Sequence, residues 1–162
     1  MFDNQINKLP MKKQKKDNKK IEKGGKIQAQ KLTLAIENEF FLEALWILSS
    51  MIEKKIKKVL EKTENIDYGA GYSLEQAVKR IKYVHLSGKH PIFSGHFDIA
   101  LIDDIRRWKN QRNIVLKDMQ GVHVSMVRLE RLAGEGERLL REWSGAAKKY
   151  KADFTISAPE NS

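Results

Sequence analysis

The sequence predicts an all-α protein, built as an antiparallel, up-down bundle of four or five helices. Apolar residues recur every three or four positions over long stretches, with charged residues between them, as in helices that bury one face. No stretch of the 162 residues shows the strict alternation of a half-buried strand. The hydrophobic content of 41% is typical of a globular protein, and short connections between the helical stretches favour antiparallel neighbours.

The clearest helical pattern covers residues 41–60, where the apolar residues form one stripe. Charged residues such as Glu43, Lys54 and Glu61 fall on the opposite face. The pattern fits either one helix over residues 27–62 or two helices that break near Asn38. The stripe consists of Phe41, Ala44, Leu45, Leu48, Met51, Ile52, Ile56, Val59 and Leu60.

A short helix flanked by two loops is predicted next. Residues 63–72 contain two glycines and predict the first loop. Ser73 and Gln76 have the spacing of a capping box, which predicts a helix that begins at this point. The second loop is predicted over residues 87–96, which contain a proline and two glycines.

Two longer helices follow, over about residues 97–119 and 122–151. The apolar stripe of the first includes Trp108 and Val115, and the charged Arg112 lies between them on the same core-facing stripe. The last helix contains three glycines, which indicate a bend or a close approach to a neighbouring helix. These are Gly134, Gly136 and Gly145.

The charge distribution divides the chain into a tail and a bundle. Residues 1–26 hold nine lysines and three acids and so carry +6 of the net charge of +10. We expect a flexible basic tail over residues 1–26, a helical bundle over residues 27–152 and a flexible end over residues 153–162. A polycationic tail attracts nucleic acid or anionic lipid without sequence preference, although it can also act only as a solubilising segment.

The composition also narrows the chemistry and the compartment. The chain has no cysteine, which excludes disulfides, thiolate nucleophiles and cysteine zinc sites and suits a reducing compartment. No apolar run reaches the roughly 18–20 residues that span a bilayer, so we expect a cytoplasmic protein without a transmembrane segment.

His85, His90 and His96 lack the helical spacing of two-histidine metal motifs, so we predict neither a metal site nor a cofactor.

The segment around Arg112 resembles the third core helix of HEPN domains. In that helix an arginine, usually followed by a polar residue, precedes a histidine by four to six intervening positions. Arg112 and Asn113 match the first half of this motif, but Lys117 and Met119 stand at the two limits of the allowed spacing and no histidine lies between them. The segments FLEALWILSSMIEKKIKKVLEK and SLEQAVKRIKYVH resemble the first and second core helices, and the likeness covers roughly residues 30–150.

The resemblance implies a bundle that dimerises, with the motifs of both chains lining one cleft. Active HEPN members are metal-independent endoribonucleases, often toxins or phage-defence effectors, in which the histidine moves a proton and the arginine stabilises the phosphate charge. Arg112, Asn113 and Lys117 would form a degenerate catalytic motif, and Glu53 with Lys57 resembles the supporting Glu-x-x-x-Lys/Arg pair of some branches. The partners implied are RNA, a second copy of the chain and a nucleotidyltransferase-like antitoxin.

The lysine changes the chemistry that such a site can perform. A guanidinium binds two phosphate oxygens and keeps its charge, whereas a lysine amine, with a reference pKa of about 10.4, is normally protonated and cannot act as a base. Arg112 and Lys117, with Lys109 as a third cation, therefore predict RNA or nucleotide binding with weak or lost ribonuclease activity.

Another interpretation needs no ligand. Arg112 can be a buried residue that pairs with a carboxylate such as Glu53 and fixes the packing of two helices. The protein would then be a non-enzymatic dimerisation or protein-interaction module with a basic tail.

Overall fold

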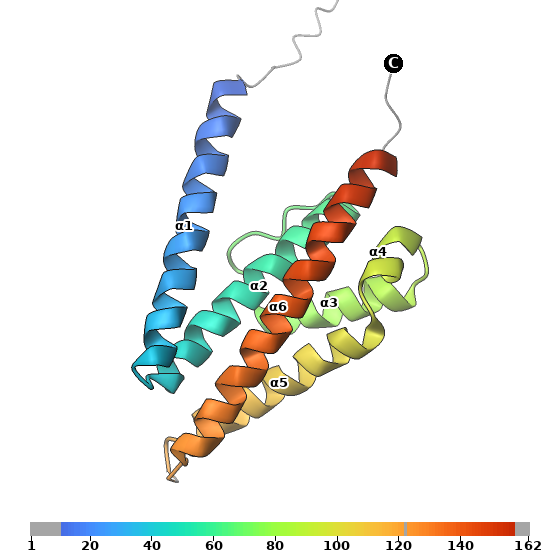
Figure 1. Ribbon diagram of the computed structural model, residues 1–162. Helices are drawn as coiled ribbons and strands as arrows, with labels where there is room; N and C mark the ends of the chain where they lie inside the picture. The colour runs from blue at the N-terminus through green and yellow to red at the C-terminus, as the bar shows by residue number, and fades with distance from the viewer. Residues whose placement is uncertain (1–10, 122, 158–162) are drawn as a thin grey trace, which may run out of the picture.

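The computed structural model of the protein describes residues 11–121 and 123–157, with side chains described from residue 23 onward. All regular structure in these residues is helical, which confirms the predicted all-α class (Figure 1). The helices of these ranges are α1 (Met11–Glu37), α2 (Phe41–Glu64), α3 (Leu74–Leu86), α4 (Pro91–His96), α5 (Ile99–Asp118) and α6 (Met126–Ser157).

A tight turn at residues 38–40 separates α1 from α2. Glu39 has a φ of 61°, which is a left-handed conformation that a helix interior does not contain. The Phe40 amide then donates to the Ala35 carbonyl at 2.7 Å and closes the end of α1. Of the two arrangements that the sequence allows, the structure has the two-helix one.

The start of α1 differs from the prediction. The helix begins at Met11, inside the segment predicted to be a flexible tail, and it continues through Gly24 and Gly25, where the sequence predicts a break. Each glycine costs only about 1 kcal/mol relative to alanine in a helix, and the surrounding lysines and glutamines are good helix formers.

The middle of the chain follows its local signals closely. The Ser73 hydroxyl accepts from the Gln76 amide at 3.4 Å, and the Gln76 side chain accepts from the Ser73 amide at 2.8 Å, which confirms the capping box. The predicted loop over residues 87–96 is wrong in part, because Pro91 begins the six-residue helix α4. Proline is favoured at the first position of a helix, since its fixed φ is already helical and its missing N–H is not needed.

The last helix is longer than the sequence predicts. It starts at Met126 rather than near residue 122, and it continues to Ser157, into the segment predicted to be a flexible end. Tyr150 is buried, and the ring of Phe154 packs against it with centroids 5.5 Å apart. These contacts support the extra turns of helix, because packing of one helical face outweighs the weak propensity of its terminal residues.

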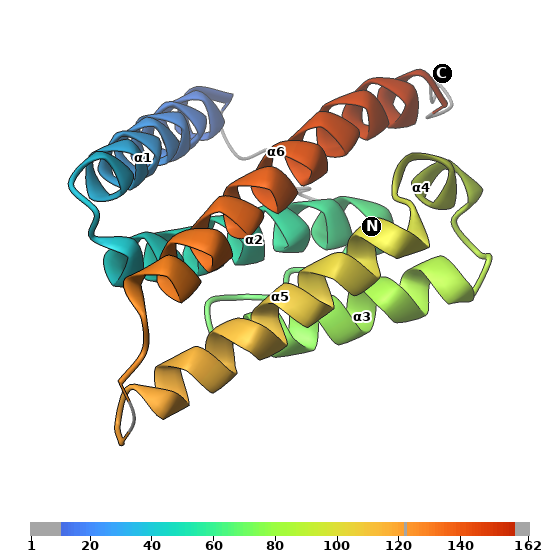
Figure 2. The same ribbon diagram turned by 60° about the horizontal axis from the view of Figure 1, so that its bottom comes forward.

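α2 and α6 occupy the centre of the bundle. α2 contacts α1, α3 and α6, and α6 also contacts α4 and α5. Figures 1 and 2 show that α1 runs antiparallel to α2, and α5 antiparallel to α6. The strict up-down order is interrupted at residues 65–73, which lead the chain back along α2, so that α3 runs in the same general direction as α2.

The helices meet most closely at Gly136 of α6. A Cβ at this position would lie 2.7 Å from Cζ2 of Trp108 on α5 and 3.0 Å from Cδ1 of Leu48 on α2, so only a hydrogen fits there. The predicted close approach is therefore confirmed at Gly136. Gly134 and Gly145, in contrast, have open space where a Cβ would be.

Within the described ranges, no helix is both long and apolar enough to cross a membrane.

Candidate functional site

Arg112, the charged residue on the apolar stripe of α5, is half-buried at the edge of α2. Its guanidinium carbon lies 5.0 Å from the centroid of the Trp46 ring of α2, which is the distance of a cation–π contact. One terminal nitrogen donates to the Asn113 side-chain oxygen at 3.1 Å. The Nε atom is buried and has no hydrogen-bond partner in the part of the chain that the structure describes. Arg112 is thus held in place by stacking on Trp46 and by its contact with Asn113, without a carboxylate partner among the described residues.

Trp46 gives this site an exposed aromatic surface. The side chain is 56% exposed, although tryptophan is usually well covered. An indole that keeps an open face beside a fixed guanidinium can accept a second flat ring.

Glu53 and Lys57 follow Trp46 along α2, at distances of about two and three helical turns. Lys57 donates to the Glu53 carboxylate at 3.3 Å, so these two predicted partners are in contact. Burial lowers the pKa of Arg112, and the Glu53 carboxylate opposes this by raising it. No direct Arg112–Glu53 ion pair is formed among the described residues, so Glu53 acts on Arg112 only at longer range.

The other predicted cations do not join Arg112. Lys117 is exposed and comes five residues later on the same helix, which places the two side chains about 140° apart around the axis. Lys109 is buried, and its ammonium pairs with Glu75 of α3, so it is engaged within the protein. In the structure Arg112 therefore contacts Asn113, as predicted, and Trp46, which was not predicted. Lys109 and Lys117 do not contact Arg112.

The histidines lie elsewhere on the chain. His85 lies near the end of α3, His90 directly precedes α4, and His96 is the last residue of α4. From the start of α5, just after these residues, to Arg112 is about 20 Å along the helix axis. His96 contacts Asp153 at 2.7 Å, at the far end of α6. His123 is exposed and lies in the connection after α5. No group of three or more potential metal-ligating side chains occurs among the residues with described positions.

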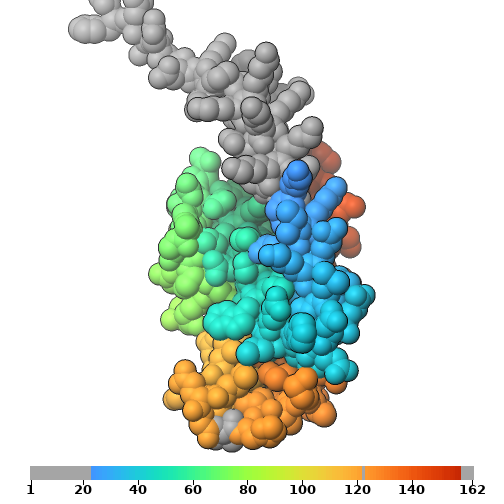
Figure 3. Space-filling model, turned by 90° about the vertical axis from the view of Figure 1, so that its left-hand side faces the viewer, coloured from blue at the N-terminus to red at the C-terminus, as the bar shows by residue number. Residues whose placement is uncertain are grey.

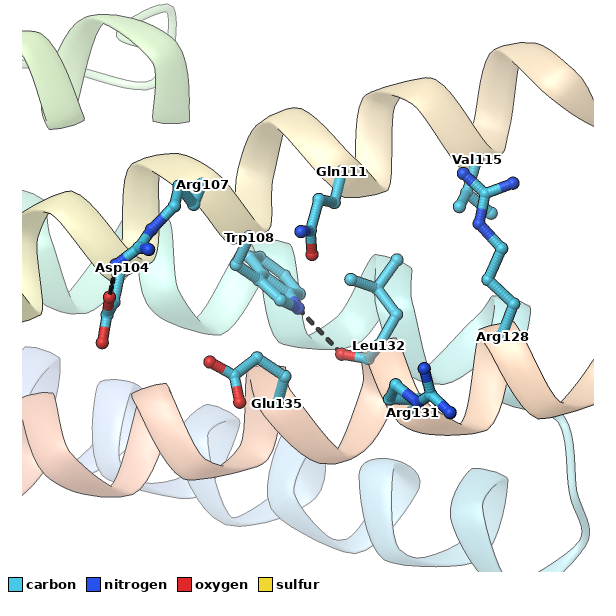
Figure 4. A pocket seen from close by; sticks show the side chains of 9 residues that line it. All are labelled: Asp104, Arg107, Trp108, Gln111, Val115, Arg128, Arg131, Leu132 and Glu135. Carbon is cyan, nitrogen blue, oxygen red and sulfur yellow. Dashed lines mark hydrogen bonds and ion pairs between the residues drawn. The ribbon is translucent and has the colours of Figure 1, made fainter.

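A charged groove of about 520 Å³ lies between α5 and α6 (Figure 4). Arg107 pairs with Asp104, and Arg128 donates to Asp118 at 3.1 Å. Arg138, beside the groove, pairs with Asp104, Glu135 and Glu142. Carboxylates neutralise most of the arginines here, and Arg131 is the lining arginine without an ion pair among the described residues. Such pairing is typical of a network that joins two helices rather than of an anion site.

The sequence pattern around Trp46 contains a signal that identifies it in retrospect. Trp46 lies off the apolar stripe of α2, between the buried Leu45 and Leu48, and so points away from the core. A large aromatic residue on the polar face of an amphipathic helix has no packing role of its own. The contact with Arg112 required the structure, because the two residues are 66 positions apart in the chain.

The chain matches no known protein family, no curated protein and no solved structure.

Proposed function

We propose that this chain is an HEPN-like RNA-binding protein without efficient ribonuclease activity, of a toxin–antitoxin or phage-defence type. The observation that carries the proposal is the Arg112–Trp46 pair, a fixed guanidinium beside an indole that is 56% exposed. The resemblance of the segment around Arg112 to the HEPN motif also favours Arg112 as the residue that binds the ligand.

The pair suits a nucleotide because each of its members recognises a different part. A guanidinium binds a phosphate through its N–H donors, and the half-buried Arg112 has no carboxylate partner among the described residues. An aromatic ring stacks on a base, which contributes about 1–3 kcal/mol per base whatever the sequence. One nucleotide can therefore place its base on Trp46 and its phosphate at Arg112.

Cleavage needs a group that takes and returns a proton, and this site lacks a suitable one. The position that the motif assigns to histidine holds Lys117, and lysine amines are normally protonated at neutral pH. The described histidines contact neither Arg112 nor Trp46. These two facts favour binding without cleavage.

The test is the binding of a fluorescein-labelled single-stranded RNA of about 12 nucleotides, followed by fluorescence anisotropy. We expect Arg112→Gln and Trp46→Ala each to weaken binding about tenfold, which corresponds to about 1.4 kcal/mol. Arg141→Gln, at an exposed arginine of α6, is the matched control and should bind as the wild type does. Equal affinity of all four proteins would overturn the proposed site.

The same RNA, incubated with the wild-type protein in a chelator and then separated by size, tests the absence of cleavage. We expect it to stay full length, while a metal-independent ribonuclease used as a positive control cuts it. Fragments that appear with the wild type and disappear with Arg112→Gln would show an active enzyme instead.

A second candidate function is protein interaction, through dimerisation or binding of a nucleotidyltransferase-like antitoxin. It is favoured by exposed apolar side chains at the end of the bundle where α5 leads into α6. In this case Val127→Glu would dissociate a complex that sedimentation detects for the wild type, and RNA binding would not depend on Trp46. The exposed apolar residues are Ile114, Met119, Met126 and Val127.

A further inference from the structure

A groove of about 710 Å³ lies between α1 and α2, and lysines line it on the α2 side. Figure 3 views the face on which these two helices lie side by side. Lys54, Lys55, Lys57 and Lys58 contribute four positive charges, against the single carboxylate of Glu61. The groove therefore has a strong excess of positive charge.

Few of these charges are neutralised within the protein. Lys57 pairs with Glu53 at 3.3 Å, whereas Lys54 donates to the neutral Gln28 side chain of α1 at 3.2 Å. Burial lowers the pKa of Lys55, and the nearby Lys58 lowers it further, since two ammonium groups repel each other. A bound anion would relieve this repulsion.

The α1 side of the groove leaves room for a ligand. Gly24 and Gly25 line it, and neither has another heavy atom within 4 Å of the place where a Cβ would be. Lys23 and Lys26 flank these glycines and are exposed. A phosphate can thus approach the helix backbone closely, with cations on both sides.

The α5–α6 groove provides the contrast. Two of its three arginines, Arg107 and Arg128, are paired with Asp104 and Asp118, and its lining also contains the carboxylates of Asp104 and Glu135 beside the third arginine, Arg131. In the α1–α2 groove, lysines outnumber acids four to one. Electrostatic attraction of a polyanion is therefore stronger at the α1–α2 groove than at the α5–α6 groove.

We propose that the α1–α2 groove binds the phosphate backbone of single-stranded RNA, independently of base sequence. Lysine is a point charge on a flexible stem and suits phosphates whose positions vary along a strand. A strand can enter the space between two helices, whereas the flat surface of a bilayer cannot. This second site is distinct from the Arg112–Trp46 site and is tested separately from it.

The experiment measures binding of the labelled RNA at about 50 mM and about 200 mM salt, since each released counterion contributes to the salt dependence. The groove variant is Lys54→Gln with Lys58→Gln, two exposed positions. Its control is Lys148→Gln with Lys149→Gln on α6, which removes the same net charge from another surface. Circular dichroism checks that both variants remain helical.

We expect the groove variant to lose at least about tenfold in affinity at low salt relative to the control, and its salt slope to shrink by about 1.4, the value for two phosphate contacts. Equal RNA affinity and equal salt slope in the groove variant and its control would overturn the groove site, independently of the result for Arg112→Gln. If only Arg112→Gln loses RNA affinity, the proposed function stands and the groove site does not.

Vesicles with about 30% phosphatidylserine distinguish RNA from a membrane surface as the source of phosphate. We expect the groove variant and the control to bind vesicles equally. A selective loss of vesicle binding in the groove variant, with RNA binding unchanged, would overturn the assignment to RNA.

Discussion

Two glycines of α6, two positions apart, have opposite surroundings. Gly136 lies against Trp108 and Leu48, whereas Gly134 is exposed with open space around it. A methyl group at Gly136 must displace buried atoms, which costs about 1–3 kcal/mol and exceeds the gain of about 1 kcal/mol in helix propensity. The same substitution at Gly134 displaces no neighbouring atom, so only the gain in helix propensity remains.

We therefore expect Gly136→Ala to lower the free energy of unfolding by up to about 2 kcal/mol and Gly134→Ala to raise it by about 0.5–1 kcal/mol. Urea denaturation followed by circular dichroism measures both. Two variants of equal stability would contradict the close packing at Gly136.

At the scale of single residues, the sequence predicted the exceptional position of Arg112 but not its surroundings. A charge on an apolar stripe is visible from helical spacing alone, and the structure finds this side chain half-buried. Its neighbour Trp46 comes from another helix and could not be predicted from spacing. The separation of Arg112 and Lys117 around the axis, in contrast, already follows from their five-residue spacing in the predicted helix. Spacing along one helix predicts a face, whereas a site requires the packing of several helices.

Among the elements, the connection between α2 and α3 depends on Glu64. The carboxylate, in a side chain that is 8% exposed, accepts from Arg80 Nε at 3.0 Å and also from Tyr68. Burial raises the pKa of Glu64, but the hydrogen bonds from Arg80 and Tyr68 lower it more, so the net pKa is below its usual value. This cluster joins Tyr68 of the connection and Arg80 of α3 to the end of α2.

A depressed carboxyl pKa stabilises the fold above the unfolded-state pKa of about 4.3, and this contribution is lost as the pH falls through the folded-state value. We expect Glu64→Gln to lower the free energy of unfolding by about 1.5–3 kcal/mol at pH 7, because charged hydrogen bonds are lost. The difference from the wild type should shrink as the pH approaches 3. Urea denaturation at both pH values measures it, and a difference that is independent of pH would contradict the role of the ionised carboxylate.

Helix boundaries were predictable where a local signal sets them. The capping box at Ser73 and Gln76 is such a signal, and the structure confirms it. The start of α1 was not predictable, because a glycine pair costs a helix only about 2 kcal/mol and need not break it. The end of α6 was not predictable, because a weak terminal segment is helical when one face packs. Tyr150 supplies this packing near the end of α6, where it is buried and contacts Thr63 of α2 at 2.8 Å.

For the whole molecule, the helical bundle was predictable from periodicity, but the direction of α3 was not. A connection as long as residues 65–73 spans up to about 30 Å when extended, which is enough to turn the chain back or to return it along the preceding helix. The choice depends on contacts such as that of Glu64 with Arg80, between residues 16 positions apart.

The central claim is that RNA contacts Trp46 at the Arg112 site, and tryptophan fluorescence tests it most directly. The chain has three tryptophans, of which Trp108 and Trp143 are buried and Trp46 is exposed. We predict that RNA quenches the emission of the wild type, and that Trp46→Phe binds RNA by anisotropy but loses most of this quenching. Equal quenching in both proteins, or none in a wild type that is saturated with RNA, would contradict the account.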